Sequence, residues 1–215
     1  MRNIKILGLA LVAMFSMSAV MAVSASADTL TSSGASSVLT GTAEPGFTDE
    51  FKTTAGIVKC PDAKYDATIT GNVTTAGSIS ATPTYANCTG FGFPATIHHN
   101  SCTYQFKILA GTAGTVNLEC STAGDAIVIT AIGAGTTKCT VSVKPQTDIP
   151  GTIKYSNIAG GITLEVSLTG IIYTHTAGTG VGACTSGSAN AGTLAAKATI
   201  SAETHAGAPL SLALS

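Results

Sequence analysis

The chain of 215 residues contains no tryptophan, and only 5% of its residues are aromatic and 10% are charged. Its single arginine is Arg2, so after residue 27 eight lysines face eleven acidic residues, which gives a net charge of −3. Proteins bind phosphate backbones with clustered lysine and arginine side chains. We therefore expect no nucleic-acid partner.

The common catalytic and ligand-binding motifs are also missing. The sequence has no G-x-S-x-G elbow and no G-x-x-x-x-G-K-[ST] phosphate loop. Zinc sites favour close cysteine pairs such as C-x-x-C, whereas the shortest cysteine spacing here runs from Cys88 to Cys102. We expect no cofactor and no metal–thiolate centre.

The first 27 residues have the layout of a secretory signal peptide. Arg2 and Lys5 precede an apolar stretch over residues 6–23, and Ala25-Ser26-Ala27 follows it. This pattern predicts cleavage between Ala27 and Asp28. An alternative is an uncleaved membrane anchor, because 18 apolar residues reach the lower limit for a spanning helix. No second run of this length follows, so we expect no membrane span in the mature chain.

Export would place six cysteines in an oxidising compartment, where an even set is expected to pair. Each disulfide bond typically adds about 2–4 kcal/mol by restricting the unfolded chain. Fifteen pairings are possible, and spacing does not choose among them. The six residues are Cys60, Cys88, Cys102, Cys120, Cys139 and Cys184.

Alternating apolar and polar residues predict β-strands along most of the mature chain. The clearest run covers residues 102–108, and a second covers residues 116–120 after a Gly-rich break. These two runs predict an antiparallel hairpin that places Tyr104 opposite Cys120. Residues 162–168 alternate in the same way, and no segment shows convincing helical spacing.

Many short strands separated by turn residues predict an all-β fold, either an antiparallel β-sandwich or a barrel-like sheet. We expect a flexible segment over residues 28–47 and a single domain over residues 48–215. Two small β-subdomains divided near residues 121–126 are an alternative. The Gly-rich residues 178–192 are expected to form a long loop that Cys184 holds in place.

Several short motifs occur in a fixed order along the chain. They are Gly56–Cys60, Tyr85–Cys88, Gly92–Thr96, Asn100–Tyr104, Lys138–Val141, Gln146 and Tyr155–Asn157. Together they resemble an uncharacterised group of exported, cysteine-paired all-β proteins of high-GC Gram-positive bacteria. The resemblance covers residues 51–202 and implies export and a β-fold, but it carries over no catalytic residue.

Two aromatic residues and two histidines between Cys88 and Cys102 are the candidate binding residues. Phe91 and Phe93 would suit a recognition surface, because aromatic side chains are enriched at binding hot spots. They would equally serve as a cap on the core of a protein with few aromatic residues, and this second interpretation is favoured.

His98 and His99 could bind a metal ion together only in a loop, since adjacent strand residues point to opposite faces. His175 and His205, which are distant in the sequence, could complete such a site, but nothing in the sequence requires it, and a solvated loop pair is the expected state.

The sequence therefore favours an exported, non-enzymatic structural or binding module of the extracellular space or cell envelope. Glycans, cell-wall material or another surface protein are the candidate partners. The alternative is a secreted hydrolase with an unrecognised Ser/His or carboxylate site. The candidate carboxylates are Asp62, Asp66, Asp125 and Glu165.

Overall fold

The structure, a computed structural model, describes residues 30–34, 37–69, 73–74, 78–107, 113–180 and 182–214. The leader predicted at residues 1–27 and its cleavage site lie outside these residues. The described residues contain no helix. Their strands are β1 (Leu30–Ser32), β2 (Ser37–Ala43), β3 (Asp49–Thr53), β4 (Gly56–Cys60), β5 (Asp62–Ile69), β6 (Val73–Thr74), β7 (Ser78–Ala86), β8 (Thr89–Gly90), β9 (Phe93–His98), β10 (Cys102–Lys107), β11 (Ala113–Cys120), β12 (Ile127–Gly133), β13 (Thr136–Val143), β14 (Gln146–Ile158), β15 (Gly161–Ala177), β16 (Gly187–Glu203), β17 (Pro209–Leu210) and β18 (Leu212–Leu214).

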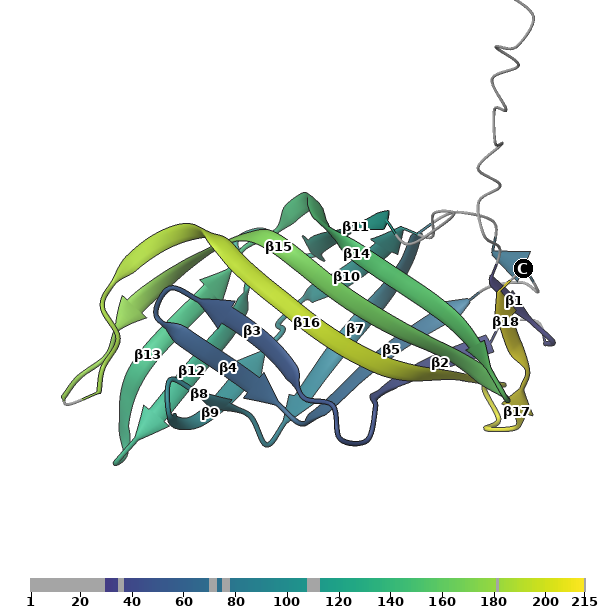
Figure 1. The fold of residues 1–215 in the computed structure, drawn as a ribbon, viewed down its shortest axis with the longest axis horizontal. Coiled ribbons are helices and arrows are strands. Elements are labelled where there is room, and N and C mark those ends of the chain that lie inside the picture. Colours follow the sequence, from purple (N-terminus) through teal and green to yellow (C-terminus); the bar gives the residue numbers. More distant parts are fainter. Residues whose placement is uncertain are drawn as a thin grey trace, which may run out of the picture.

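Two long strands, β15 and β16, close a large antiparallel sheet on itself (Figure 1). β16 pairs with β15 along one side and with both β2 and β3 along the other. β2 pairs with residues 198–203 of β16 and β3 with residues 193–195, so these two strands lie in line. β13 and β14 lie in line along β15 in the same way.

Six such in-line pairs, here called composite strands, build the rest of the sheet. Each composite strand pairs with the one before it and the one after it in the sequence. With β15 and β16 they make a closed sheet of eight strands in sequence order. This confirms the predicted all-β antiparallel class. Of the two predicted architectures, sandwich and barrel-like sheet, the closed sheet corresponds to the barrel-like one. The composite strands are β2–β3, β4–β5, β7–β8, β9–β10, β11–β12 and β13–β14.

Turn-forming residues interrupt every composite strand at about the same level, here called the waist. Proline has no backbone N–H for the strand ladder, while Asn and Gly adopt positive φ most readily. The interruptions therefore follow from the local sequence. They contain Pro45-Gly46, Pro61, Asn87 (φ 55°), Asn100 (φ 52°), Gly124 (φ 90°) and Pro145.

The waist divides the closed sheet into two halves. The β2 half contains β2, β5, β7, β10, β11 and β14, and the β3 half contains β3, β4, β8, β9, β12 and β13. β15 and β16 run through both halves, as Figure 1 shows with the β3 half on the left. The alternative domain division near residues 121–126 coincides with one interruption at the waist.

All six cysteines are paired, as predicted, and the structure selects one of the fifteen connectivities. Cys60–Cys88 and Cys102–Cys120 join neighbouring composite strands at the waist. Cys139–Cys184 ties β13 to the segment between β15 and β16. This segment is shorter than the loop predicted over residues 178–192, because β16 already begins at Gly187.

The predicted hairpin of β10 and β11 is present, but its register differs from the prediction by two residues. Cys102 lies opposite Cys120, so Tyr104 faces Leu118 instead. The sequence placed the turn near Thr112, outside the described residues. The disulfide bond between directly opposed cysteines sets the observed register.

A small three-stranded sheet of β18, β1 and β6, here called the cap, lies at the end of the β2 half (Figure 1). It brings the first described strand to the last, with Leu30 opposite Leu214. Residues 37–43, within the segment that the sequence predicted to be flexible, form the strand β2. β2 is paired on both sides, with β5 and β16, and buries Leu39 in the interior.

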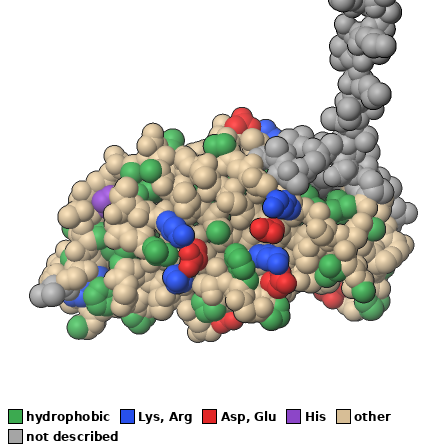
Figure 2. All heavy atoms as spheres, viewed as in Figure 1, with side chains coloured by type: hydrophobic (Ala, Val, Ile, Leu, Met, Phe, Trp, Pro, Cys, Tyr) green, Lys and Arg blue, Asp and Glu red, His purple; other side chains and the backbone are tan. Residues whose placement is uncertain are grey.

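Alternation sorts side chains between the interior and the outer face. On β15, Ile162, Leu164, Val166 and Leu168 are buried, whereas Glu165 and Ser167 are exposed. Figure 2 shows the charged side chains of one face in small mixed-sign groups within a largely uncharged surface. Ion pairs such as Lys197–Glu44 (2.8 Å) account for such groups. The charges on this face therefore form no large patch of one sign, whereas the interior of the closed sheet is lined by apolar side chains.

Candidate functional site

Three cavities follow one another inside the closed sheet. The first, of about 50 Å³, lies at the waist and extends into the β3 half. The second, of about 20 Å³, shares Tyr104, Leu168 and Leu194 with the first. The third, of about 40 Å³, shares Tyr65 and Leu164 with the second and reaches the cap at the end of the β2 half.

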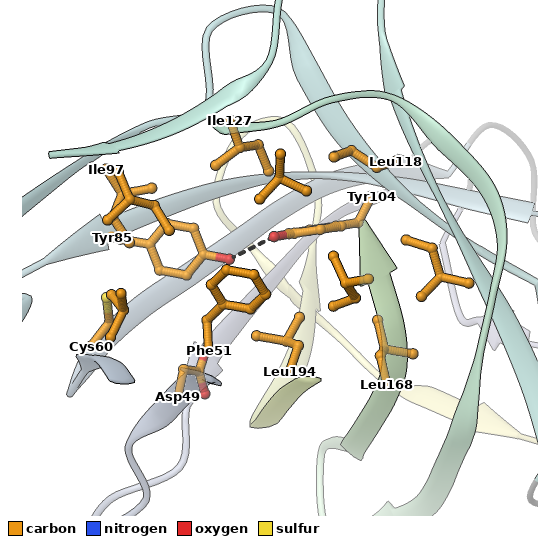
Figure 3. Close-up of a pocket in the computed structure, with 15 residues that line it drawn as sticks. Asp49, Phe51, Cys60, Tyr85, Ile97, Tyr104, Leu118, Ile127, Leu168 and Leu194 are labelled. Carbon is orange, nitrogen blue, oxygen red and sulfur yellow. Dashed lines mark hydrogen bonds between the residues drawn. The ribbon is translucent and has the colours of Figure 1, made fainter. Parts of the chain in front are cut away.

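The linings are mostly aliphatic, as expected for the inner face of a closed sheet. Figure 3 shows the first cavity, with Ile97, Ile127 and Leu118 along one side and Leu168 and Leu194 along the other. An eight-stranded closed sheet has an interior that side chains nearly fill, or that holds one small ligand. The row of cavities shows that side chains leave a narrow space here.

Four polar side chains near the waist interrupt this apolar lining, and we call them the tyrosine cluster: Asp49, Tyr65, Tyr85 and Tyr104. They come from β3, β5, β7 and β10, and alternation turns each towards the interior. Tyr65 and Tyr85 pack edge to face with ring centroids 6.2 Å apart. The hydroxyl groups of Tyr85 and Tyr104 meet in the first cavity (Figure 3).

Hydrogen bonds link the four members of the tyrosine cluster. The Tyr65 hydroxyl donates to Asp49 Oδ2, and the Lys197 backbone N–H donates to Asp49 Oδ1 over 3.4 Å. The Tyr85 hydroxyl donates to the Tyr104 oxygen over 3.3 Å. Tyr85 also forms a side-chain hydrogen bond with Tyr65, so the four side chains form one connected network. Tyr104 lines both the first and the second cavity.

Burial controls the protonation of the tyrosine cluster. Burial, with the nearby Asp49 charge, raises the pKa of Tyr65 well above its usual value. Burial likewise raises the pKa of Tyr85 and of Tyr104, so the three phenols stay neutral hydrogen-bonding groups. Burial also raises the pKa of the Asp49 carboxyl group, although the bonds from Tyr65 and Lys197 oppose this shift.

The candidate residues Phe91 and Phe93 lie at the β8–β9 turn, away from these cavities. Phe91 has φ 57°, and its ring packs beside Gly56, where an added Cβ would lie 2.8 Å from Cδ1. The Phe93 ring covers Gly133 and Gly182. Both rings are half-buried against the core, and Phe91 also borders an open surface depression of about 580 Å³.

The candidate residues His98 and His99 lie on the outside of the closed sheet and in the chain that follows β9. His98 is exposed and pairs with Val128, while His99 is half-buried and its Nδ1 has no hydrogen-bond partner among the residues that the structure describes. His175 is buried, with its Nδ1 against the Thr185 carbonyl oxygen, and His205 is exposed. Within the described ranges, no three His, Cys, Asp or Glu side chains could hold a metal ion together.

The four candidate carboxylates are separate from one another. Asp62 accepts a hydrogen bond from Asn87, and Asp125 accepts one from the Ser101 backbone N–H over 3.3 Å. Asp66 is exposed on β5, and Glu165 lies across from Lys154 and Lys197 on the outer face. The tyrosine cluster was not among the predicted site residues. The sequence offered one weak signal for it. Asp49 lies two residues before Phe51, and residues two apart on a strand face the same side, so an inward Phe51 implies an inward Asp49.

Comparison of the chain with protein-family models, curated proteins and solved structures finds no match. Among the described residues, no helix is long and apolar enough to cross a membrane. The functional interpretation of the candidate site therefore depends on the geometry of the site alone.

Proposed function

We propose that the protein is an exported, non-enzymatic binding module that holds a small apolar ligand inside its closed sheet. The observation that carries this proposal is the row of three aliphatic cavities through the interior. Binding sites for small molecules are concave and mostly apolar, with a few polar groups that orient the ligand. The tyrosine cluster supplies polar groups of this kind.

Export is supported by the disulfide bonds and by the N-terminal sequence. Three disulfide bonds that use every cysteine are typical of proteins that fold in an oxidising compartment. The signal-peptide pattern of residues 1–27 agrees with this location. We therefore place the protein outside the cytosol, in the extracellular space or the cell envelope.

A binding role has better support than glycoside cleavage. Cleavage of a glycosidic bond uses two carboxylates that face the same bond. Here the candidate carboxylates lie apart in turns and on outer faces, and two of them, Asp62 and Asp125, accept hydrogen bonds from neighbouring residues. In the interior, Asp49 is bonded to Tyr65 and faces hydroxyl groups.

A pair of adjacent substitutions on β16 tests the proposal. Ala196 is buried and lines the second cavity, while its neighbour Ala195 lies opposite Ser167 on the outer face. We expect the purified, oxidised protein to bind the slender apolar probe n-butane saturably and in equimolar amounts, as measured by NMR chemical-shift changes of the methyl groups that line the cavities. Ala196→Leu should weaken this binding about tenfold or more, and Ala195→Leu should leave it unchanged.

Circular dichroism and a thermal melt would check that both variants fold. Equal probe binding by the wild type and both folded variants would contradict a site in the interior. So would an absence of saturable binding by the wild type.

A further inference from the structure

We propose that an open depression on the outside of the β3 half binds a short, neutral oligosaccharide. This depression, here called the surface site, goes beyond the proposed function, because none of its described lining residues borders the three interior cavities. Three observations support the assignment: a concave surface held in shape by disulfide bonds, a phenylalanine ring in its wall, and a lining whose charged side chain is already paired.

Three segments that are far apart in the sequence form the surface site. They are the β3–β4 turn with Ala55, the β8–β9 turn with Phe91, and the segment before β16 with Ala183. All three lie on the left in Figure 1. Together they enclose about 580 Å³, which is within the usual range for small-molecule sites.

Disulfide bonds hold two walls of the surface site in place. Cys60–Cys88 joins the end of β4 to the residue before β8, and Cys139–Cys184 ties the segment before β16 to β13. The Cys184 backbone N–H also donates to the Lys138 carbonyl oxygen over 3.1 Å. A site that is shaped before the ligand arrives pays less ordering entropy on binding.

Alternation on β4 separates the surface site from the interior. Val58 and Cys60 are buried and line the first cavity, whereas Ile57 and Lys59 face outwards and line the surface site. Lys59 lies opposite Thr89 of β8, which is exposed. The same short stretch of sheet therefore offers an aliphatic side chain, an ammonium group and a hydroxyl group.

The Phe91 ring forms an apolar wall beside Ile57. Phe91 has φ 57°, a conformation that glycine and asparagine adopt more readily than bulky residues. The half-buried residue packs beside Gly56 and borders the surface site. Aromatic side chains supply much apolar contact area at binding sites. The C–H face of a sugar ring is apolar and flat, so it suits this wall.

The charge and the openness of the surface site favour a neutral, hydroxyl-rich ligand. Among the described lining residues, Lys59 alone is charged, and its Nζ lies 2.9 Å from Glu50 Oε1. This ion pair keeps further donors and acceptors for sugar hydroxyls. In an open depression the outer hydroxyls of a sugar stay in water, which avoids the cost of burying them unpaired. An alkyl chain there would leave much of its apolar surface in water.

Five oligosaccharides of four units test the assignment by NMR titration of the oxidised protein. Cellotetraose, maltotetraose, mannotetraose and tetra-N-acetylchitotetraose are neutral, and tetragalacturonate carries four carboxylates. We expect at least one neutral chain to bind saturably and to shift the signals of Ile57, Phe91 and Gly92. Tetragalacturonate should bind more weakly than the best neutral chain.

Three variants connect this binding to named residues. Phe91→Gly removes the ring and suits the backbone conformation, so it should weaken the best neutral chain about tenfold or more, as for an aromatic hot spot. Ile57→Ala should weaken it about threefold, within the range of ordinary contact residues. Ile132→Ala is the matched control, because Ile132 and Ile57 are 42% and 43% exposed but only Ile57 lines the surface site. Circular dichroism checks that all three fold.

The outcomes separate this proposal from the proposed function. The assignment fails if no neutral chain binds, if Phe91→Gly keeps full binding, or if Ile132→Ala loses as much as Ile57→Ala. Tighter binding of tetragalacturonate would show an anion site instead. Binding of n-butane in the interior should be the same in Phe91→Gly as in the wild type. If n-butane binds and no neutral chain does, the surface site is wrong and the proposed function stands, and the reverse result has the reverse meaning.

Discussion

The two halves of the closed sheet are closed by different means. Beyond the waist, the β3 half is braced by Cys139–Cys184, which links β13 to the segment before β16. The β2 half ends instead in the three-stranded sheet of β1, β6 and β18, held by backbone pairing and by leucines such as Leu30. All the cysteines are used elsewhere, so this cap has no covalent tie of its own.

This difference indicates where the interior can open. Segments held by few strands and a few apolar contacts open locally at lower free energy than covalently braced ones. The third cavity lies directly beneath the cap, with Leu30 and Leu214 in its lining. We therefore expect a ligand to reach the interior through the β2 half, while the β3 half keeps its shape.

Removal of the brace from the β3 half should have the largest effect on stability. Cys139→Ala with Cys184→Ala releases a loop of 45 residues, for which chain entropy predicts a loss of about 4 kcal/mol. The matched pair Cys102→Ala with Cys120→Ala releases 18 residues and should cost about 3 kcal/mol. Urea unfolding of the oxidised proteins measures both losses. The opposite order would contradict the role assigned to the longer link.

A substitution that creates a cavity in the cap should have the next largest effect on stability. Leu30→Ala removes a side chain that is 1% exposed and should cost about 3 kcal/mol, the usual range for a buried leucine. Hydrogen exchange should then speed up in β1 and β18 but not in β12 and β13. Faster exchange spread evenly over both halves would show that the cap does not open as a separate unit.

Two tyrosines allow the polar contacts of the two halves to be compared: Tyr173, which is buried, and Tyr155, which is half-buried. In the β3 half, the Tyr173 hydroxyl accepts from the Thr54 backbone N–H at 2.6 Å and lies 3.0 Å from Thr54 Oγ1. Tyr173→Phe should therefore cost about 2 kcal/mol, because it leaves this N–H without its partner.

Tyr155, in the β2 half, is the control, since its hydroxyl has no partner among the described residues. Tyr155→Phe should change the urea midpoint little. A larger loss for Tyr155 than for Tyr173 would reverse the comparison.

The smallest effect concerns Asp49 and depends on pH. Burial raises the pKa of its carboxyl group above the ordinary value of 3.8. The folded state therefore binds a proton more tightly than the unfolded chain, so this contribution to stability is complete below pH 3.8 and is lost as the pH rises through the folded value.

Asp49→Asn removes this dependence. The free energy of unfolding of the wild type should fall relative to that of the variant between about pH 3 and pH 7. Urea unfolding at several pH values measures this difference. A constant difference would show that the charge of Asp49 is not unfavourable in the folded protein.

Much of the fold could be predicted because strand signals are local. The alternation in residues 162–168 depends only on which side chains face the interior, and β15 has the expected pattern. The hairpin of β10 and β11 was likewise visible. Its register was not, because that depends on the turn and on which cysteines oppose each other.

The candidate site was far less predictable. Its four polar residues are spread between positions 49 and 104 and come together only because β3, β5, β7 and β10 meet at the waist. Phe91 and Phe93 attracted attention because aromatic residues are few, yet their rings cover glycines at the β8–β9 turn. A single Asp or Tyr at an inward position has no distinctive spacing, so alternation alone could not mark it as part of a site.

The sequence by itself determined that this protein consists of β-strands and that its cysteines pair, because residue alternation and an even set of thiols behind a predicted leader can be recognised without the tertiary structure. Only the tertiary structure decided that the strands align into composite strands, that the sheet closes, and which cysteines meet. Closure depends on pairing between β16 and the first strands, about 150 residues earlier. Contacts at that separation are set by the packing of the whole sheet, which no local pattern specifies.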